Sequence, residues 1–310
     1  MNEVYHIPAM LQETIEGLNI KPDGVYVDVT FGGGGHSRAI MSGLKKGGKL
    51  YSFDQDADAV ANAIDDERWT FVHSNFRYLR NWMDYYGVEQ IDGLLADLGV
   101  SFHHFDCPER GFSFRFSAPL DMRMNQTAKR TAADIVNSYS EEDLAKVLWL
   151  YGELKNGRQI ARNICKARAQ KPIERTEDLV AIMAKGERLE ANGEIEVATQ
   201  YKKDLARLFQ ALRIEVNDEM GALREMLVAA RDLLKPGGRI AILTYHSLED
   251  RLVKNFLRSG NLEGTIEKDF YGNALTPFDV IEKGREASAD EVERNPRSRS
   301  AKLRVAEKKS

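Results

Sequence analysis

The chain has 310 residues, of which 43% are hydrophobic and 30% are charged, as in a globular protein with one large or two linked domains. Its formal net charge of −4 argues against a uniformly basic protein, so any surface for nucleic acid must be local. The two cysteines, Cys107 and Cys165, form no metal-binding pattern, and we find neither a signal peptide nor an 18-residue apolar stretch. We therefore expect a cytoplasmic protein without a structural metal or a membrane segment.

Residues 25–37, VYVDVTFGGGGHS, predict a buried strand, a glycine-rich turn and the start of a helix. Alternating valines suit the strand, and the glycines at 32–35 permit positive φ and close approach of a ligand. Ser37 is the expected N-cap of the helix. Strand, turn and helix together are typical of the first unit of a nucleotide-binding α/β fold.

Three further strands follow in alternation with helices, a rhythm that predicts right-handed crossovers and a parallel sheet. These strands are expected at 49–54, 69–74 and 91–98, and helices at 7–19, 39–44, 57–64 and 76–86.

The alternation stops after the fourth strand. Residues 104–205 show helical patterns, clearest at 141–150 and 157–169, but no convincing strand. A long helical pattern then spans 205–234 and ends at the turn sequence KPGG. A fifth strand at 239–245, a helix at 247–257 and strand candidates at 278–282 and 301–305 complete the expected elements. We predict an α/β core, residues 1–103 and 206–310, with an inserted all-helical domain at 104–205.

The glycine turn alone is compatible with several ligands. A phosphate-binding Walker loop requires a lysine that is absent here, and a dinucleotide turn fits only in a forced register. Asp28 and Asp97, expected where two strands end, would face one crevice and favour a cationic ligand such as S-adenosylmethionine. Asp54, at the end of the second strand, could accept hydrogen bonds from ribose hydroxyls in a dinucleotide or an adenosyl ligand.

Ordinary structural roles compete with each of these assignments. Asp28 could cap a local turn, Phe76 read alone favours the core, and His36 could be a loop histidine with no catalytic role.

Several long motifs then carry a resemblance: DVTFGGGGHS, IDGLLADLGVS, ERGFSFRF, PLDMRMN, FQALRIEVNDE, LKPGGRIAILTYHSLEDRLVK and NPRSRSAKLRV. From His6 to about Val305 the chain closely resembles the bacterial 16S ribosomal RNA cytosine-N4 methyltransferase family, known as RsmH or MraW. The resemblance implies a class I, Rossmann-like methyltransferase core with an inserted substrate-recognition domain. It also implies S-adenosylmethionine as the methyl donor and a cytidine in the decoding region of 16S rRNA, in the small ribosomal subunit, as the acceptor.

The matched motifs also imply site residues. The implied cofactor contacts are Gly34, Gly35, His36, Asp54, Phe76 and Asp97. The family's next cofactor residue is a glutamine, and His104 stands in its place here. The family sequence before FQALRI also differs, since this chain reads KDLARL there.

The expected chemistry centres on Asp97. We expect its carboxylate to accept a hydrogen bond from N4 of an unpaired cytosine, while His246 either relays a proton or is structural. Arginines are the candidate phosphate contacts, although any one of them could be a solvated surface charge: Arg110, Arg115, Arg123, the basic helix 158–168, Arg297 and Arg299. A nicotinamide-dependent oxidoreductase, a non-catalytic RNA-binding assembly factor and a DNA methyltransferase are the alternatives.

Overall fold

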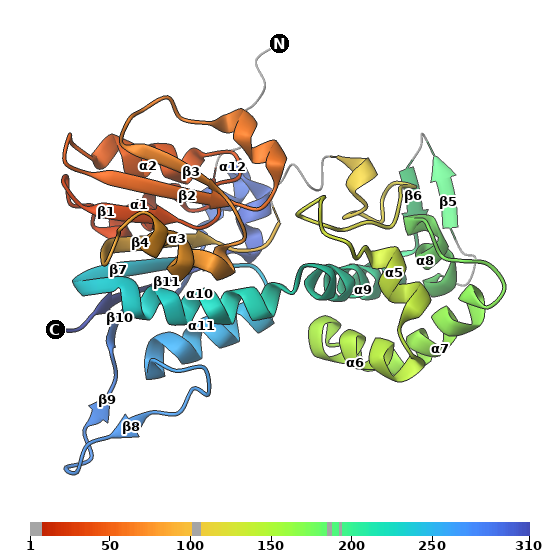
Figure 1. Cartoon of the computed structure of the whole chain (residues 1–310). Coiled ribbons are helices and arrows are strands. Elements are labelled where there is room, and N and C mark those ends of the chain that lie inside the picture. The colour runs from red at the N-terminus through yellow and green to blue at the C-terminus, as the bar shows by residue number, and fades with distance from the viewer. Residues whose placement is uncertain (1–7, 101–106, 185–187, 192–193) are drawn as a thin grey trace. The chain divides into compact units, whose positions relative to one another are not determined.

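A seven-stranded sheet forms the centre of one of the two units of this protein (Figure 1). The computed structural model describes residues 8–100, 107–184, 188–191 and 194–310. The chain divides into two compact units, Met1–Gly99 with Met220–Ser310, and Val100–Glu219. The sheet unit is therefore built from both ends of the chain.

The sheet has the order β10-β11-β7-β4-β1-β2-β3. Strands β3, β2, β1, β4 and β7 are parallel neighbours, and β11 pairs antiparallel with both β7 and β10. The strands are β1 Val25–Asp28, β2 Lys49–Asp54, β3 Trp69–His73, β4 Ile91–Asp97, β7 Leu234–Thr244, β10 Phe278–Glu286 and β11 Lys302–Lys308. All seven strands of this sheet fall on segments that the sequence predicts as strands, and the bounds of β2 agree to the residue.

Helices lie on both faces of the sheet (Figure 1). α1 contacts α2 and strands β4, β7 and β11, whereas α11 contacts β7, β10 and β11. A buried apolar cluster, which includes Leu95, Leu243 and Val305 of the sheet, fills the space under α1 and α2. The helical elements of this unit are α1 Leu11–Leu18, α2 Gly35–Gly43, η1 Ala57–Asn62, η2 Phe76–Tyr78, α3 Leu79–Tyr85, α10 Glu219–Leu233, α11 Ser247–Ser259, α12 Ala289–Arg294 and η4 Pro296–Ser300.

The second unit is mainly helical and has its own apolar core. Its helices are η3 Pro108–Arg110, α5 Ala132–Ser138, α6 Glu141–Gly152, α7 Gly157–Arg168, α8 Thr176–Met183 and α9 Thr199–Asn217. The prediction of an all-helical insert is wrong in one respect, because β5 Arg188–Ala191 and β6 Glu194–Val197 form a two-stranded antiparallel sheet. Charged residues alternate with apolar ones along these strands, which is a strand pattern, but each strand has only four residues, too few for the pattern to stand out.

The long helix predicted over 205–234 is two helices. α9 ends at Asn217, Asp218 takes a left-handed conformation with φ 47°, and α10 begins at Glu219. A left-handed residue cannot continue an α-helix, so the break is local and needs neither glycine nor proline. The helical pattern ends just before KPGG, as predicted, since α10 ends at Leu233. The four residues of KPGG nevertheless belong to β7, where the pairing with β4 shifts register.

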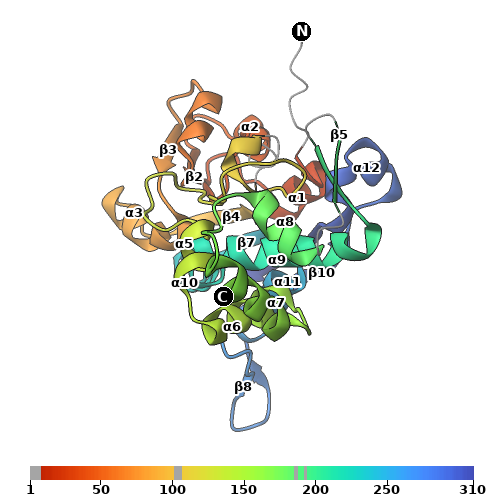
Figure 2. The same ribbon diagram turned by 90° about the vertical axis from the view of Figure 1, so that its right-hand side faces the viewer.

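A second small sheet that the sequence analysis missed projects from the sheet unit. Strands β8 Glu267–Lys268 and β9 Ala274–Leu275 form a hairpin that extends away from the large sheet (Figures 1 and 2). The carboxylate of Asp269 closes its turn by accepting hydrogen bonds from the backbone N–H groups of Tyr271 and Asn273. Across the described residues, no helix is long and apolar enough to span a membrane.

Gly93 is the position where the centre of the sheet is least tolerant of added volume. It pairs with Tyr26 across β1 and β4, and a Cβ at Gly93 would lie 2.7 Å from Tyr26 Cε1 and 3.2 Å from the Arg239 carbonyl oxygen. The Tyr26 ring cannot move aside easily, because it is 1% exposed and its hydroxyl accepts a 2.7 Å hydrogen bond from Lys21 N.

We expect Gly93→Ala to lower the free energy of unfolding by roughly 1–3 kcal/mol, the usual cost of overpacking a core. Urea denaturation measures this change. Ser42→Ala, on the exposed side of α2, is the control and should stay within about 0.5 kcal/mol of the parent protein. An unchanged denaturation midpoint for Gly93→Ala would contradict the described packing.

Candidate functional site

The chain order of the sheet reverses at β1 and β4. From β1 the chain adds β2 and β3 on one side, and then returns to place β4 on the other side of β1. Ligands of open α/β sheets bind at such a switch point, outside the carboxyl ends of the strands. Asp54, Asp28 and Asp97 are the last residues of β2, β1 and β4, three adjacent strands of the sheet.

Asp28 does not open towards solvent, so the expectation that it faces the crevice is wrong. Its side chain is 0% exposed. Ser37 Oγ donates to Asp28 Oδ2 at 2.6 Å, and the backbone N–H of Thr30 donates to Oδ1 at 3.0 Å. Burial raises the pKa of Asp28, and the Ser37 hydrogen bond acts against that rise. The alternative role, in which Asp28 caps the local turn, is the one that the structure bears out.

A chain of hydroxyl groups extends from Asp28 across the sheet. Because Ser37 gives its proton to Asp28, Ser52 Oγ must be the donor in the 2.8 Å contact between the two serines. Trp69 Nε1 in turn donates to Ser52 Oγ at 2.9 Å. These bonds join α2 to strands β1, β2 and β3 beneath the glycine turn.

The glycine turn leads directly into α2, which begins earlier than predicted. Gly34, with φ 75°, is the N-cap and Gly35 is the first helical residue. Ser37 is therefore inside the helix, and the prediction that it is the N-cap is wrong. A Cβ at Gly34 would lie 3.0 Å from the Phe31 ring, and one at Gly35 would lie 2.7 Å from Pro8 Cγ. Gly34 requires glycine because its φ is positive and the Phe31 ring is close. Gly35 requires glycine because Pro8 leaves no room for a Cβ.

Asp97, unlike Asp28, is partly exposed. Its side chain is 24% exposed, and its backbone N–H donates to Thr30 Oγ1 at 2.6 Å. Tyr245, directly after β7, donates its hydroxyl proton to Asp97 Oδ1 at 2.6 Å. Burial raises the pKa of Asp97 to about 7, with the Tyr245 hydrogen bond acting to lower it and the negative charge of Glu249 adding to the rise.

His36 lies beside Asp97 in the first turn of α2 and is 5% exposed. Its Nε2 lies 3.2 Å from the carbonyl oxygen of Ala9, which can only accept, so Nε2 carries the proton. Nδ1 lies 3.7 Å from Asp97 Oδ2. Burial lowers the pKa of His36, so the ring is neutral and presents a lone pair at Nδ1.

Asp54 and Phe76 lie where the sequence places them, at the end of β2 and just after β3. Asp54 Oδ2 accepts from Gly32 N at 2.8 Å, so the second strand holds the start of the glycine turn. Phe76 is only partly buried, and Asn75 caps the short helix that it begins. The reading of Phe76 as a core residue is therefore not supported. His104 lies outside the described residues.

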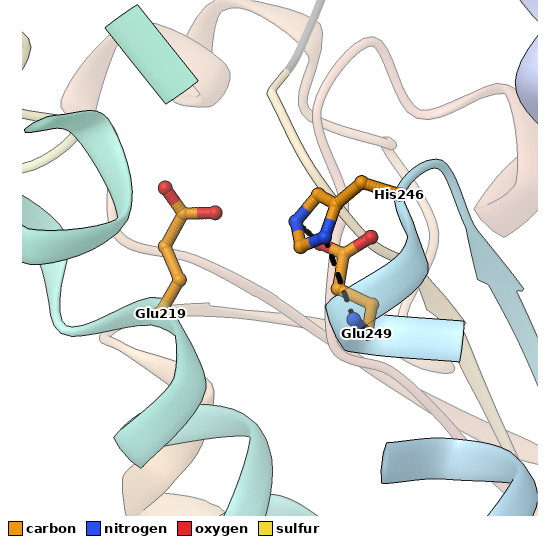
Figure 3. A group of neighbouring side chains, drawn as sticks. All are labelled: Glu219, His246 and Glu249. Carbon is orange, nitrogen blue, oxygen red and sulfur yellow. Dashed lines mark hydrogen bonds and ion pairs between the residues drawn. The ribbon is translucent and has the colours of Figure 1, made fainter. Parts of the chain in front are cut away.

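His246 makes local contacts. It is the N-cap of α11, its Nδ1 accepts from Glu249 N at 3.4 Å, and its Nε2 lies 3.1 Å from Glu249 Oε1 (Figure 3). Both ring nitrogens thus face Glu249, an arrangement that favours the structural role over the proton relay.

The arginines predicted to contact phosphate fall into two groups. Arg110 is 7% exposed and donates to the carbonyl oxygens of Arg123 and Met124, and Arg123 makes a bidentate pair with Asp121. The prediction for Arg110 is wrong because a buried guanidinium cannot reach a phosphate. Six candidates are exposed, two of them further along the basic helix 158–168: Arg115, Arg158, Arg162, Lys166, Arg297 and Arg299.

Six strands that run in one direction, an antiparallel β11 inserted between β7 and β10, and a glycine turn at the switch point define the α/β class I methyltransferase fold. Residues 3–309 match the MraW methylase family, and the chain belongs to that family.

Its relatives include proteins named "Ribosomal RNA small subunit methyltransferase H". Those of Phocaeicola vulgatus and Bacteroides thetaiotaomicron are 58% identical to this chain over 308 and 306 residues, and that of Cytophaga hutchinsonii is 50% identical over 307. Each comparison covers at least 98% of this chain and at least 98% of the relative.

The raised pKa of Asp97 predicts a stability cost at high pH. With a pKa of about 7, against 3.8 for an ordinary aspartate, the folded protein binds this proton more tightly than the unfolded chain does. The contribution of Asp97 to stability therefore falls as pH rises from about 4 to about 7, and it stays low above that range.

Asp97→Asn removes this ionisation and should melt at a higher temperature than the parent at pH 8, with a smaller difference at pH 5. Calorimetry of both proteins at both pH values measures the change. Asp84→Asn, an exposed acid, is the control. Equal melting temperatures at pH 8 would contradict the raised pKa of Asp97 in the folded protein.

Proposed function

We propose that this protein transfers a methyl group from S-adenosylmethionine to the N4 amine of a cytidine in the decoding region of 16S rRNA. The observation that carries the proposal is the partly exposed Asp97 carboxylate at the switch point of a methyltransferase fold. The names of the relatives support ribosomal RNA of the small subunit as the substrate. Such a substrate places the enzyme in the cytoplasm.

The residues around the crevice fit S-adenosylmethionine. A Cβ at Gly33 would meet nothing within 4 Å, so the turn borders open space beside the start of α2. Free N–H groups at a helix N-terminus can bind the carboxylate of the cofactor. The Asp54 carboxylate can accept from its ribose hydroxyls, and the Asp97 carboxylate attracts its positive charge. We assign cofactor binding to Gly34, Gly35, His36, Asp54, Phe76 and Asp97. When bound, the cofactor supplies an electrophilic methyl group on a positive sulfonium.

Asp97 has a catalytic role in this proposal. The N4 lone pair of cytosine is delocalised into the ring, which makes it a weak nucleophile. An acceptor aimed at an N4 hydrogen stabilises the positive charge that develops on the amine during attack. Asp97 Oδ1 is already bonded to Tyr245, so Oδ2 is the oxygen assigned to this contact.

The acceptor cytosine must be unpaired, because N4 lies on its base-pairing edge. Enzymes that act on this edge use single-stranded nucleic acid or extrude the base from a helix. We assign RNA recognition to the second unit and to the exposed arginines Arg115, Arg158, Arg297 and Arg299. Because the net charge is −4, binding depends on such local contacts.

Asp97→Ala should lower methyl transfer at least about 100-fold, the usual cost of removing a group that stabilises charge in the transition state. The assay uses labelled S-adenosylmethionine and small ribosomal subunits that lack this methyl group, and the labelled nucleoside is identified after digestion.

Asp84→Ala, which removes an exposed carboxylate paired with Arg80, is the matched control and should retain full activity. Equal transfer by Asp97→Ala and the parent protein would contradict the role of Asp97. Transfer to duplex DNA in preference to ribosomal RNA would contradict the assigned substrate.

The pH dependence of the reaction follows from the pKa of Asp97. The ionised carboxylate binds the cationic cofactor and accepts from N4, and the pKa of this group is about 7 in the free protein. The value of kcat/KM for the cofactor reports ionisations of the free enzyme. We expect it to rise with pH, with a midpoint at about pH 7 and a plateau above about pH 8. A profile that is flat between pH 5.5 and 8.5 would contradict the assignment.

A further inference from the structure

Tyr245 is a residue of the site that has no role of its own in the sequence analysis or in the proposed function. It follows the last residue of β7, whose Leu243 pairs with Asp97 of β4. Its hydroxyl donates to Asp97 Oδ1 at 2.6 Å, its ring packs partly against the apolar cluster under α1, and its backbone N–H donates to Glu249 Oε2 at 3.0 Å. The ring and the backbone of Tyr245 are therefore both held in place.

Among the described residues, the other groups around Asp97 offer its carboxylate no proton. Neutral His36 presents a lone pair at Nδ1, because its proton lies on Nε2 against the Ala9 carbonyl oxygen. Asp28 and Glu249 are acidic, and the Thr30 hydroxyl, whose oxygen accepts from Asp97 N–H, donates its own proton to Asp28 Oδ1 at 3.4 Å. In the part of the chain that the structure describes, Tyr245 is thus the side chain whose proton reaches the Asp97 carboxylate.

We infer that Tyr245 is a positioning residue, whose hydroxyl fixes Asp97 Oδ1 and leaves Oδ2 to accept from the target amine. The inference rests on the proposed role of Asp97. A hydrogen bond to the ionised form of an acid favours that form, so Tyr245 opposes the effects of burial and of the nearby acids. The pKa of Tyr245 is itself raised well above its usual range by burial and by Asp97, so the hydroxyl keeps its proton over the working pH range.

Tyr245→Phe keeps the ring and removes only the hydroxyl group. A hydrogen bond to a charged group corresponds to about one to two pKa units, so the midpoint of the pH profile of kcat/KM should move upward by about that amount. At pH 7 the variant should be roughly 10-fold slower than the parent, and the deficit should shrink as pH rises towards 9. Circular dichroism and thermal unfolding check that the variant is folded.

Tyr26→Phe is the matched control. It also removes a buried tyrosine hydroxyl, one that accepts from Lys21 N at the opposite end of β1, and it should leave the midpoint unchanged. A loss of activity in Tyr245→Phe that is uniform with pH would indicate a purely structural role and overturn the inference. An unchanged profile would overturn it as well.

Asp97→Asn separates the inference from the proposal on which it rests. If Asp97→Asn is inactive while Tyr245→Phe keeps the parent midpoint, only the role of Tyr245 is wrong. If Asp97→Asn methylates ribosomal RNA at the parent rate, the proposed role of Asp97 itself fails.

Discussion

The buried carboxylate of Asp28 is the constraint around which the site is built. A carboxylate with no exposure to water is costly unless its oxygens accept hydrogen bonds, and here the donors come from Ser37 and Thr30. Ser37 lies in α2, so this requirement fixes the helix against β1. The bonds from Ser37 through Ser52 to Trp69 then hold β2 and β3 to the same point. The glycine turn is thus a short open segment between two fixed ends.

The hydrogen bonds of Asp28 also help to position Asp97. Thr30, whose N–H binds Asp28, accepts from the backbone of Asp97 through its hydroxyl oxygen. The end of β4 is therefore tied to the end of β1, and Tyr245 ties it to the end of β7. Asp97 lies among groups that disfavour its ionisation, with one donor that favours it, and this balance raises its pKa to about 7. A carboxylate whose pKa lies near 7 lowers the stability of the fold when it ionises, and its ionised form binds a cation. Functional sites often combine lower stability with such a binding role.

The sequence predicts the large sheet well because its strands are short apolar runs bounded by turn residues. The last residue of β2, Asp54, and the carboxylate near the end of β4, Asp97, were both predicted as site residues from their position alone. Asp28 was misassigned because a carboxylate at a strand end looks the same in sequence whether it turns towards the ligand or into the core. Its partner Ser37, nine positions along the chain, is the signal that separates the two cases, but the serine was taken for a helix cap.

Three structural features were not predicted from the sequence: the position of Tyr245, the β5–β6 hairpin and the helix break at Asp218. Tyr245 was counted as the end of a strand, and only the pairing of β7 with β4 brings it to Asp97. The β5–β6 hairpin had a usable signal, since Asn-Gly separates the two strands in the sequence, a pair strongly favoured in tight hairpin turns. The break at Asp218 had none, because an aspartate in a left-handed conformation cannot be recognised without the neighbouring helices.

The ionisation of Asp97 can be measured directly. The protein is labelled with ¹³C at aspartate carboxyl carbons, the Asp97 signal is assigned by its loss in Asp97→Asn, and its chemical shift is followed with pH. The account predicts a titration midpoint near 7 in the free protein. It also predicts a lower midpoint when S-adenosylmethionine is added, because a positive charge nearby favours the carboxylate. A midpoint near 4 in the free protein, or no response to the cofactor, would contradict the central claim that Asp97 has a pKa of about 7 and faces the methyl donor.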